Sequence, residues 1–191
     1  QHRLGHTQEA LNSLATAVKL APQQALYEYE YIAMLIKEKK LPEARTRLAA
    51  LKDDAAQSAD FYLLRADYAN QSGSTADAFS ALQTSISKDP GFKRAWANLY
   101  ELARQPQYSQ AFITTAEQYL AATPDDAWLR RLLAEHHINH QAYAAARSHY
   151  QYLLSAGQFK DDPWLYNNLA NTLLPDNAEQ ALAYAEQAEQ L

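Results

Sequence analysis

The sequence has no cysteine, four glycines and one methionine among its 191 residues. The absence of cysteine excludes disulfide bonds and thiolate metal sites, and it is compatible with the cytosol and the periplasm alike. An excess of positive charge is also absent, because 17 Lys and Arg stand against 22 Asp and Glu, which gives a net charge of -5. Binding to phosphates needs cations clustered on one face, so we expect no nucleic-acid partner.

Long apolar runs and recognisable catalytic motifs are missing as well. No run approaches the roughly 18 apolar residues of a membrane span, so we expect no membrane contact by this segment. The sequence has no Gly-rich phosphate loop, no cysteine nucleophile and no serine in a strand-to-helix elbow. Its many carboxylates are scattered over helix surfaces and linkers. We therefore predict a protein that is not an enzyme and that has no cofactor.

One histidine cluster invites a test for metal binding. His136, His137 and His140 lie close together, and His136 and His140 are one helical turn apart, a spacing that can chelate a metal. Glu135 precedes the first histidine instead of following it, so the zinc-protease order His-Glu-x-x-His is absent. We interpret the three residues as surface histidines and predict no metal site.

What the sequence does contain is helical composition and a period. Hydrophobic residues make up 48% of the chain, and Ala, Leu, Gln and Glu are frequent, which favours helices throughout. The period is 34 residues long, and a period of this length is typical of solenoids, in which a repeat cannot bury its apolar face alone. We predict an all-α superhelical solenoid of about eleven antiparallel helices. The residues that mark the period stand 34 positions apart, each closing a helix-like stretch: Pro22, Ala56, Pro90, Pro124 and Gln158.

The period sets the expected domain organisation. We predict a single continuous array over residues 1–191, interpreted as a fragment of a longer array with any targeting segment outside it. In the first repeat only the second helix, about 7 to 20, is retained. The predicted repeats cover residues 1–22, 23–56, 57–90, 91–124, 125–158 and 159–191.

Small residues and acidic linkers give the repeats local detail. Ala66 and Ala78 are expected where the two helices of the third repeat cross closely, and Ala134 and Ala146 play the same part in the fifth. Gly73 is expected at a helix C-cap, where most residues are disfavoured. Brief acidic linkers are well placed to cap the helices that follow them, namely Asp53-Asp54, Asp125-Asp126 and Asp161-Asp162.

The predicted repeat 91–124 carries a family resemblance. Its Trp96, followed three residues later by Leu99, and its closing Pro124 resemble the pattern of tetratricopeptide repeat (TPR) proteins. The resemblance covers nearly the whole chain, since the period is kept. It implies a non-catalytic protein–protein interaction scaffold, with a protein or peptide partner held along a concave surface.

A narrower resemblance comes from the last predicted repeat. The run Asn167-Asn168-Leu169-Ala170 and the later Ala-Leu-x-Tyr-Ala-Glu-x-Ala element at 181–188 are similar to the TPR-repeat lipoprotein of the PEP-CTERM/exosortase system. That resemblance implies a role in bacterial exopolysaccharide production and surface protein sorting. It also implies a periplasmic protein, or one anchored to a membrane by a lipoprotein N-terminus outside this segment. A cytoplasmic location is the alternative.

Candidate binding residues follow from the repeat register. In a TPR solenoid the first helix of each hairpin lines the concave surface, so its polar positions away from the core are the expected ligand contacts. The residues in this register are Tyr29, Lys37, Asp67, Asn70, Arg94, Glu101, Arg104, Arg131, Glu135, Asn139, Asn167 and Asn171.

Two other functions remain open at this stage. Trp96, Trp128 and Trp164, together with thirteen tyrosines, suggest an aromatic track for sugar rings and hence a carbohydrate-binding module. Aromatic residues at these positions are also ordinary hairpin packing. A structural spacer between other domains is the third hypothesis.

Overall fold

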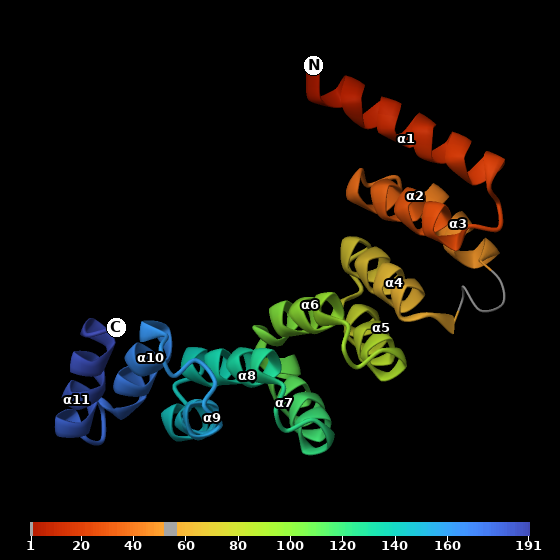
Figure 1. The fold of residues 1–191 in the computed structure, drawn as a ribbon. Helices are drawn as coiled ribbons and strands as arrows, with labels where there is room; N and C mark the ends of the chain where they lie inside the picture. Colours follow the sequence, from red (N-terminus) through yellow and green to blue (C-terminus); the bar gives the residue numbers. More distant parts are fainter. Residues whose placement is uncertain (1, 52–56) are drawn as a thin grey trace. The chain divides into compact units, whose positions relative to one another are not determined.

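The computed structural model describes residues 2–51 and 57–191, with side chains from residue 6 onward. Those residues form eleven helices and no strand, which confirms the all-α prediction (Figure 1). The chain divides into two compact units, residues 1–102 and 103–191, and each is described by itself. The boundary falls inside the predicted repeat 91–124, and the single continuous array over 1–191 stays a prediction.

The first unit begins with α1 (His2–Leu20), which stands where the second helix of a repeat is expected, and continues with helical hairpins. Proline and glycine mark the ends of its helices close to the predicted positions, although the first helix begins at His2 and not near residue 7. Ala56, which would close the second repeat, lies outside the described residues, as do Asp53 and Asp54. The helices are α1 (His2–Leu20), α2 (Ala25–Lys37), α3 (Leu41–Ala50), α4 (Ala59–Gln71), α5 (Thr75–Lys88) and α6 (Lys93–Ala103).

The second unit has five helices. Pro106 lies in the first turn of its first helix, where the missing N–H is no loss, and α6 ends shortly before it, at Ala103. Figure 1 shows α8 beside α9 and α10 beside α11, and both pairs are in contact. The helices are α7 (Pro106–Ala122), α8 (Ala127–Asn139), α9 (Tyr143–Ser155), α10 (Pro163–Leu173) and α11 (Ala178–Glu189).

The turns inside three of the hairpins share one backbone conformation, a residue with positive φ. Lys39, Gly73 and Gln141 have φ of 58°, 83° and 58°, and they stand at multiples of the 34-residue period. The next residue closes a Schellman motif, as in the 2.8 Å bond from the Ser74 N–H to the Ala69 carbonyl. The prediction for Gly73 is confirmed. The same series reaches Pro175, four periods after Lys39. The proline ring forbids positive φ, which explains why the last hairpin has a different turn.

Apolar side chains at helical spacing form the cores. In the first unit Ile32 and Leu35 of α2 are fully buried with Ala44 of α3, and Leu11 of α1 joins the same cluster. In the second unit Ala134, Ala146, Tyr150, Leu153, Leu165 and Leu169 form the core. Burying one Leu or Ile side chain contributes roughly 1.5–3 kcal/mol. The predicted close crossings are confirmed as buried, because Ala66, Ala78, Ala134 and Ala146 are at most 2% exposed.

Two of the acidic linkers cap helices as predicted. The Asp126 carboxylate accepts a hydrogen bond from the Leu129 N–H at the start of α8, at 3.0 Å. The Asp162 carboxylate accepts one from the Trp164 N–H at the start of α10, at 2.9 Å. Each cap satisfies a backbone donor that has no partner inside the helix and contributes about 1 kcal/mol.

Candidate functional site

Two adjacent pockets lie along the first helices of the first unit. One, of about 430 Å³, is lined by α2, α4 and α6, and the other, of about 230 Å³, by α4, α5 and α6. Asp67 and Asn70 of α4 line both pockets, so the two form one feature, which we name the first-helix groove. Its polar lining consists of Glu30, Lys37, Asp67, Asn70, Gln71, Arg94, Asn98 and Glu101.

Asp67 is the most constrained charge in this groove. Its carboxylate accepts a hydrogen bond from the Asn98 amide at 3.1 Å, and the Arg94 guanidinium lies 3.8 Å from its other oxygen. Burial raises the pKa of the Asp67 carboxyl above its ordinary value, although the charge of Arg94 acts in the opposite direction. The side chain is 28% exposed, so Asp67 remains open to a ligand from the groove.

The groove brings together five of the twelve residues predicted from the register: Lys37, Asp67, Asn70, Arg94 and Glu101. Tyr29 lies on the same helix as Lys37, but its hydroxyl is 2.8 Å from the Ser58 hydroxyl at the N-cap of α4. Sequence reasoning missed Asn98. Helical periodicity could have found it, because Arg94, Asn98 and Glu101 are spaced by four and three residues on one face of α6.

The predicted residues of the second unit are arranged differently. The Arg131 side chain on α8 donates a hydrogen bond to the Glu135 carboxylate at 3.2 Å. Its guanidinium also lies 4.1 Å from the centre of the Trp164 ring on α10. Arg131, hydrogen-bonded to Glu135 on its own helix, therefore joins α8 to α10. Arg104, Asn139, Asn167 and Asn171 are exposed.

The three tryptophans are packed to different degrees. Trp96 is 2% exposed, and its indole N–H donates to the Pro90 carbonyl at 2.9 Å. Trp128 and Trp164 are half-buried. Trp164 is covered by Arg131 on one side and contacts the edge of Tyr150 with ring centres 5.5 Å apart. These contacts leave no track of fully exposed indole rings.

The interpretation of the histidines as surface residues is wrong for two of them. His136 and His137 are 1% and 7% exposed, because α8 turns them towards α7 and α9. The His136 ring contacts Phe112 of α7 and is 2.8 Å from the Ser109 hydroxyl, and the His137 ring stacks on His149 of α9 at 5.6 Å. Burial lowers the pKa of His136 and of His149 to about 4, and the neighbouring imidazoles add to the effect.

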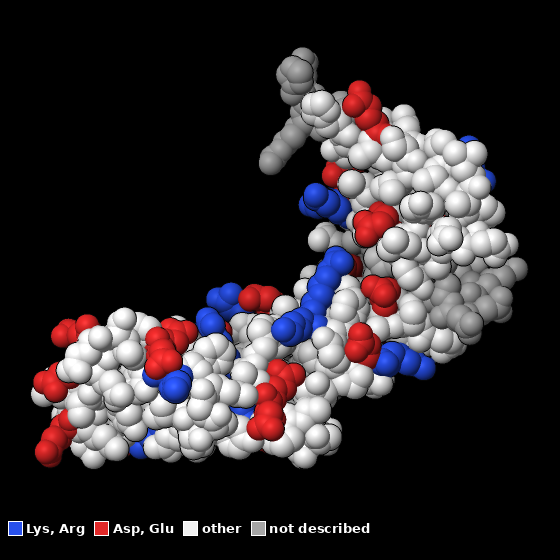
Figure 2. Space-filling view, viewed as in Figure 1, with Lys and Arg blue, Asp and Glu red and all other residues white. Residues whose placement is uncertain are grey.

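These imidazoles are not arranged as a metal site. Across residues 6–51 and 57–191, no group of three or more His, Asp or Glu side chains is placed to hold a metal ion. Among the same residues, no helix combines the length and the apolar character that crossing a bilayer requires. On the face drawn in Figure 2, acidic and basic side chains are interspersed, without a broad patch of one sign.

Comparison with known proteins places the fold. No family model matches the chain, and no curated protein sequence matches it. Among solved structures, MamA of strain AMB-1 matches with a TM-score of 0.58 at 17% identity, over 89% of this chain and 92% of MamA. YrrB, described as a TPR protein with an unusual peptide-binding site, matches with a TM-score of 0.58 at 14% identity, over 93% and 91%.

A third structure, a tetratricopeptide repeat protein from Parabacteroides merdae, matches with a TM-score of 0.54 at 16% identity. The match covers all of this chain and 74% of that one. At these identities the likeness is one of fold. The chain has the all-α fold of tetratricopeptide repeat proteins.

Proposed function

We propose that the chain is a non-catalytic scaffold that binds a protein or peptide partner along the first-helix groove. The observation that carries the proposal is that two pockets, lined by α2, α4, α5 and α6, share Asp67 and Asn70 and form one continuous lining. Folds of this type are built to present such surfaces, and YrrB is described as having a peptide-binding site.

The chemistry of the lining suits an extended peptide. Side-chain amides such as Asn70 can donate to and accept from a peptide backbone, which fixes an extended segment without demanding one sequence. The groove offers charges of both signs, because α2 contributes Glu30 and Lys37 and α6 contributes Arg94 and Glu101. Charges at a rim mainly set the association rate and its dependence on salt.

The test is site-specific crosslinking. A photo-crosslinking amino acid at Asn70 should capture a partner in extracts of the source cells, whereas the same group at the exposed Gln118 of α7 should not. Combining the Asn70 crosslinker with Arg94→Glu should abolish the product. Equal capture from both positions would contradict a groove-specific partner.

The biological setting is a separate part of the proposal. The Asn-Asn-Leu-Ala run at 167–170 and the element at 181–188 support a role in bacterial exopolysaccharide export or surface protein sorting. We place the protein in the periplasm or on a lipoprotein anchor, with the cytoplasm as the alternative. Deletion of the gene should then reduce secreted polysaccharide, and cell fractionation should find the protein outside the cytosol.

A further inference from the structure

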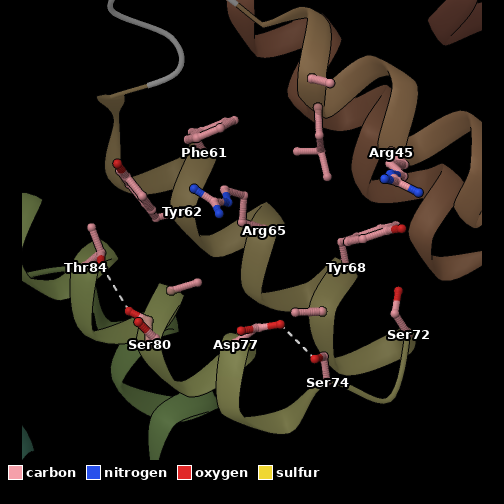
Figure 3. Close-up of a pocket in the computed structure, with 14 residues that line it drawn as sticks. Arg45, Phe61, Tyr62, Arg65, Tyr68, Ser72, Ser74, Asp77, Ser80 and Thr84 are labelled. Carbon is pink, nitrogen blue, oxygen red and sulfur yellow. Dashed lines mark hydrogen bonds between the residues drawn. The ribbon is translucent and has the colours of Figure 1, made fainter.

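A second pocket lies on the opposite side of α4 from the first-helix groove. Residues two apart on an α-helix are rotated by about 200° around the helix axis, so their side chains point to nearly opposite sides. Arg65 and Tyr68 are therefore turned away from Asp67 and Asn70. They line a pocket of about 560 Å³ between α3, α4 and α5, which we name the arginine pocket (Figure 3). Its lining is Arg45, Leu48, Ala49, Phe61, Tyr62, Arg65, Tyr68, Ala69, Ser72, Ser74, Asp77, Ser80, Ala81 and Thr84.

The arginine pocket is apolar at its base and cationic above it. Leu48, Ala69 and Ala81 are at most 9% exposed and form the base. Figure 3 shows Arg65 projecting from α4 into the middle of the pocket, with Arg45 of α3 and Tyr68 on one side and Ser80 and Thr84 of α5 on the other. Hydroxyl groups thus surround two guanidinium groups over an apolar surface.

The two guanidinium groups are available for a ligand. Neither Arg45 nor Arg65 forms an ion pair with any residue that the structure describes, and Arg65 lies only loosely over Phe61 and Tyr62, at 5.8 and 5.7 Å. Asp77, the single carboxylate among the described residues of the lining, accepts a hydrogen bond from the Ser74 hydroxyl at 2.7 Å in the first turn of α5. This local surplus of positive charge stands out on a chain with a net charge of -5.

We propose that the arginine pocket is a second docking site, which binds an acidic segment of a partner protein with an apolar side chain between its carboxylates. Guanidinium groups bind carboxylates through paired N–H donors, and the apolar base offers a place for a Phe or Leu side chain. A neighbouring hollow of about 760 Å³ along α3 shares Arg45, Ala49, Tyr68 and Ser72. This continuation gives room for an extended peptide.

Charge argues for a peptide over a nucleic acid. Phosphate backbones require several cations in a row, whereas the described lining of this pocket holds two cations and the Asp77 carboxylate. A carboxylate-bearing peptide needs only the two guanidinium groups. The site is independent of the first-helix groove, since the side chains concerned lie on different faces of α4.

The experiment measures fluorescence anisotropy with the full chain and a labelled peptide, Gly-Asp-Glu-Phe-Asp-Glu-Leu-Gly. The amide analogue Gly-Asn-Gln-Phe-Asn-Gln-Leu-Gly is the matched probe. Arg45→Gln combined with Arg65→Gln should weaken binding of the acidic peptide at least about tenfold, because charge-assisted hydrogen bonds are lost. The amide analogue should bind weakly to native protein and variant alike.

Three further variants isolate the cause. Lys19→Gln with Lys88→Gln removes the same charge from exposed helix ends and should leave affinity unchanged. Ala49→Phe should weaken binding by filling the pocket while both arginines remain. Arg45→Glu with Arg65→Glu should reverse the preference towards a peptide that carries Lys in place of Asp and Glu. Circular dichroism checks that each variant is folded.

Several results would overturn the proposal. They are absence of binding to the native chain, unchanged affinity in the Arg45→Gln and Arg65→Gln variant, and tighter binding of oligodeoxythymidylate than of the acidic peptide. Lys37→Gln with Arg94→Gln tests the first-helix groove and should not alter binding of the acidic peptide. A failure of the proposed function and a failure of the arginine pocket are therefore distinguishable.

Discussion

The two compact units place acidic residues at the same repeat position and use them differently. Asp67 and Glu135 stand two 34-residue periods apart on first helices. Asp67 lines a pocket, half-buried, with Arg94 at 3.8 Å, and stays accessible. Glu135 accepts a hydrogen bond from Arg131, which also covers Trp164 of the next first helix. A repeat position therefore decides which face a side chain occupies, and its neighbours decide whether the side chain stays accessible or contacts another helix.

The cores differ as well. His137 stands at the repeat position that Leu35, Ala69 and Ala103 occupy, and all four residues are buried. The first unit fills this position with Leu35 and Ala69, whereas the second unit has Ala103 there and then buries the His137 imidazole against His149. Titratable groups are thus built into the packing of α7, α8 and α9. The second unit should respond to acid in a way that the first does not.

The largest expected effect is this loss of stability in acid. The folded pKa of His136 and of His149 is about 4, below the ordinary value of 6.5. As pH falls below about 6.5 the unfolded chain takes up protons first, so stability is full above that pH and declines down to about pH 4. We expect a loss of the order of 2–3 kcal/mol from buried His136 alone. Urea unfolding at pH 7 and pH 4.5 measures it.

Variants locate the source of the acid sensitivity. His136→Leu with His149→Leu should reduce the pH dependence, whereas His6→Gln, at an exposed position on α1, should leave it unchanged. If the double variant lost stability in acid as steeply as the native chain, carboxylates and not the buried imidazoles would be responsible.

The close helix crossings should respond alike in the two units. Ala78 and Ala146 occupy the same repeat position and are 1% and 0% exposed. Replacing either by Leu should cost roughly 1–3 kcal/mol through overpacking. Thermal unfolding of Ala78→Leu and Ala146→Leu checks this, with Ala76→Leu at an exposed position of α5 as the control. An unchanged midpoint for either buried variant would contradict the register.

Substitutions at the positive-φ residues of the hairpin turns should change stability by a smaller amount, and with opposite sign in the two units. Gly73 has a φ of 83° and open space where a Cβ would lie, so Gly73→Ala should cost about 1 kcal/mol through backbone strain alone. Gln141 adopts the same left-handed region with a side chain, so Gln141→Gly should stabilise by roughly 0.5–1 kcal/mol. Chemical unfolding midpoints measure both, and destabilisation by Gln141→Gly would refute the argument.

The smallest expected effects on stability distinguish Arg131 in the second unit from Arg94 in the first. Arg131→Ala removes the contact with Trp164 and should cost about 0.5–1 kcal/mol. Arg94→Ala breaks only a long, mostly exposed pair with Asp67 and should cost no more than a few tenths of a kcal/mol. Its expected consequence is loss of the partner that is crosslinked at Asn70. Equal destabilisation by the two changes would erase the contrast between the units.

Much of the fold was predictable because repeat and helix periods are local properties of the chain. Proline and glycine positions predicted the helix ends, and small residues such as Ala78 predicted the close crossings. The same register could have predicted that His137 is buried, since Leu35 and Ala69 share its position. It was interpreted instead as a polar residue on a surface, which residue type alone suggests.

The residues that line the pockets were predictable only in part. Register predicted that Lys37, Asp67 and Arg94 share one face, and the structure places them around common pockets. It could not predict that Arg131 would be engaged by Trp164, because that contact joins side chains 33 residues apart.

By itself the sequence determined the helices, their ends and the face on which each side chain lies, because backbone geometry and apolar spacing act over a few residues. Tertiary structure alone decided which polar residues remain accessible. It left Arg45 and Arg65 beside an apolar base, and it buried His136 of α8 against α7. Accessibility depends on how the side chains of neighbouring helices pack against one another. That packing is set by contacts between residues far apart in the sequence and not by the position of a residue along the chain.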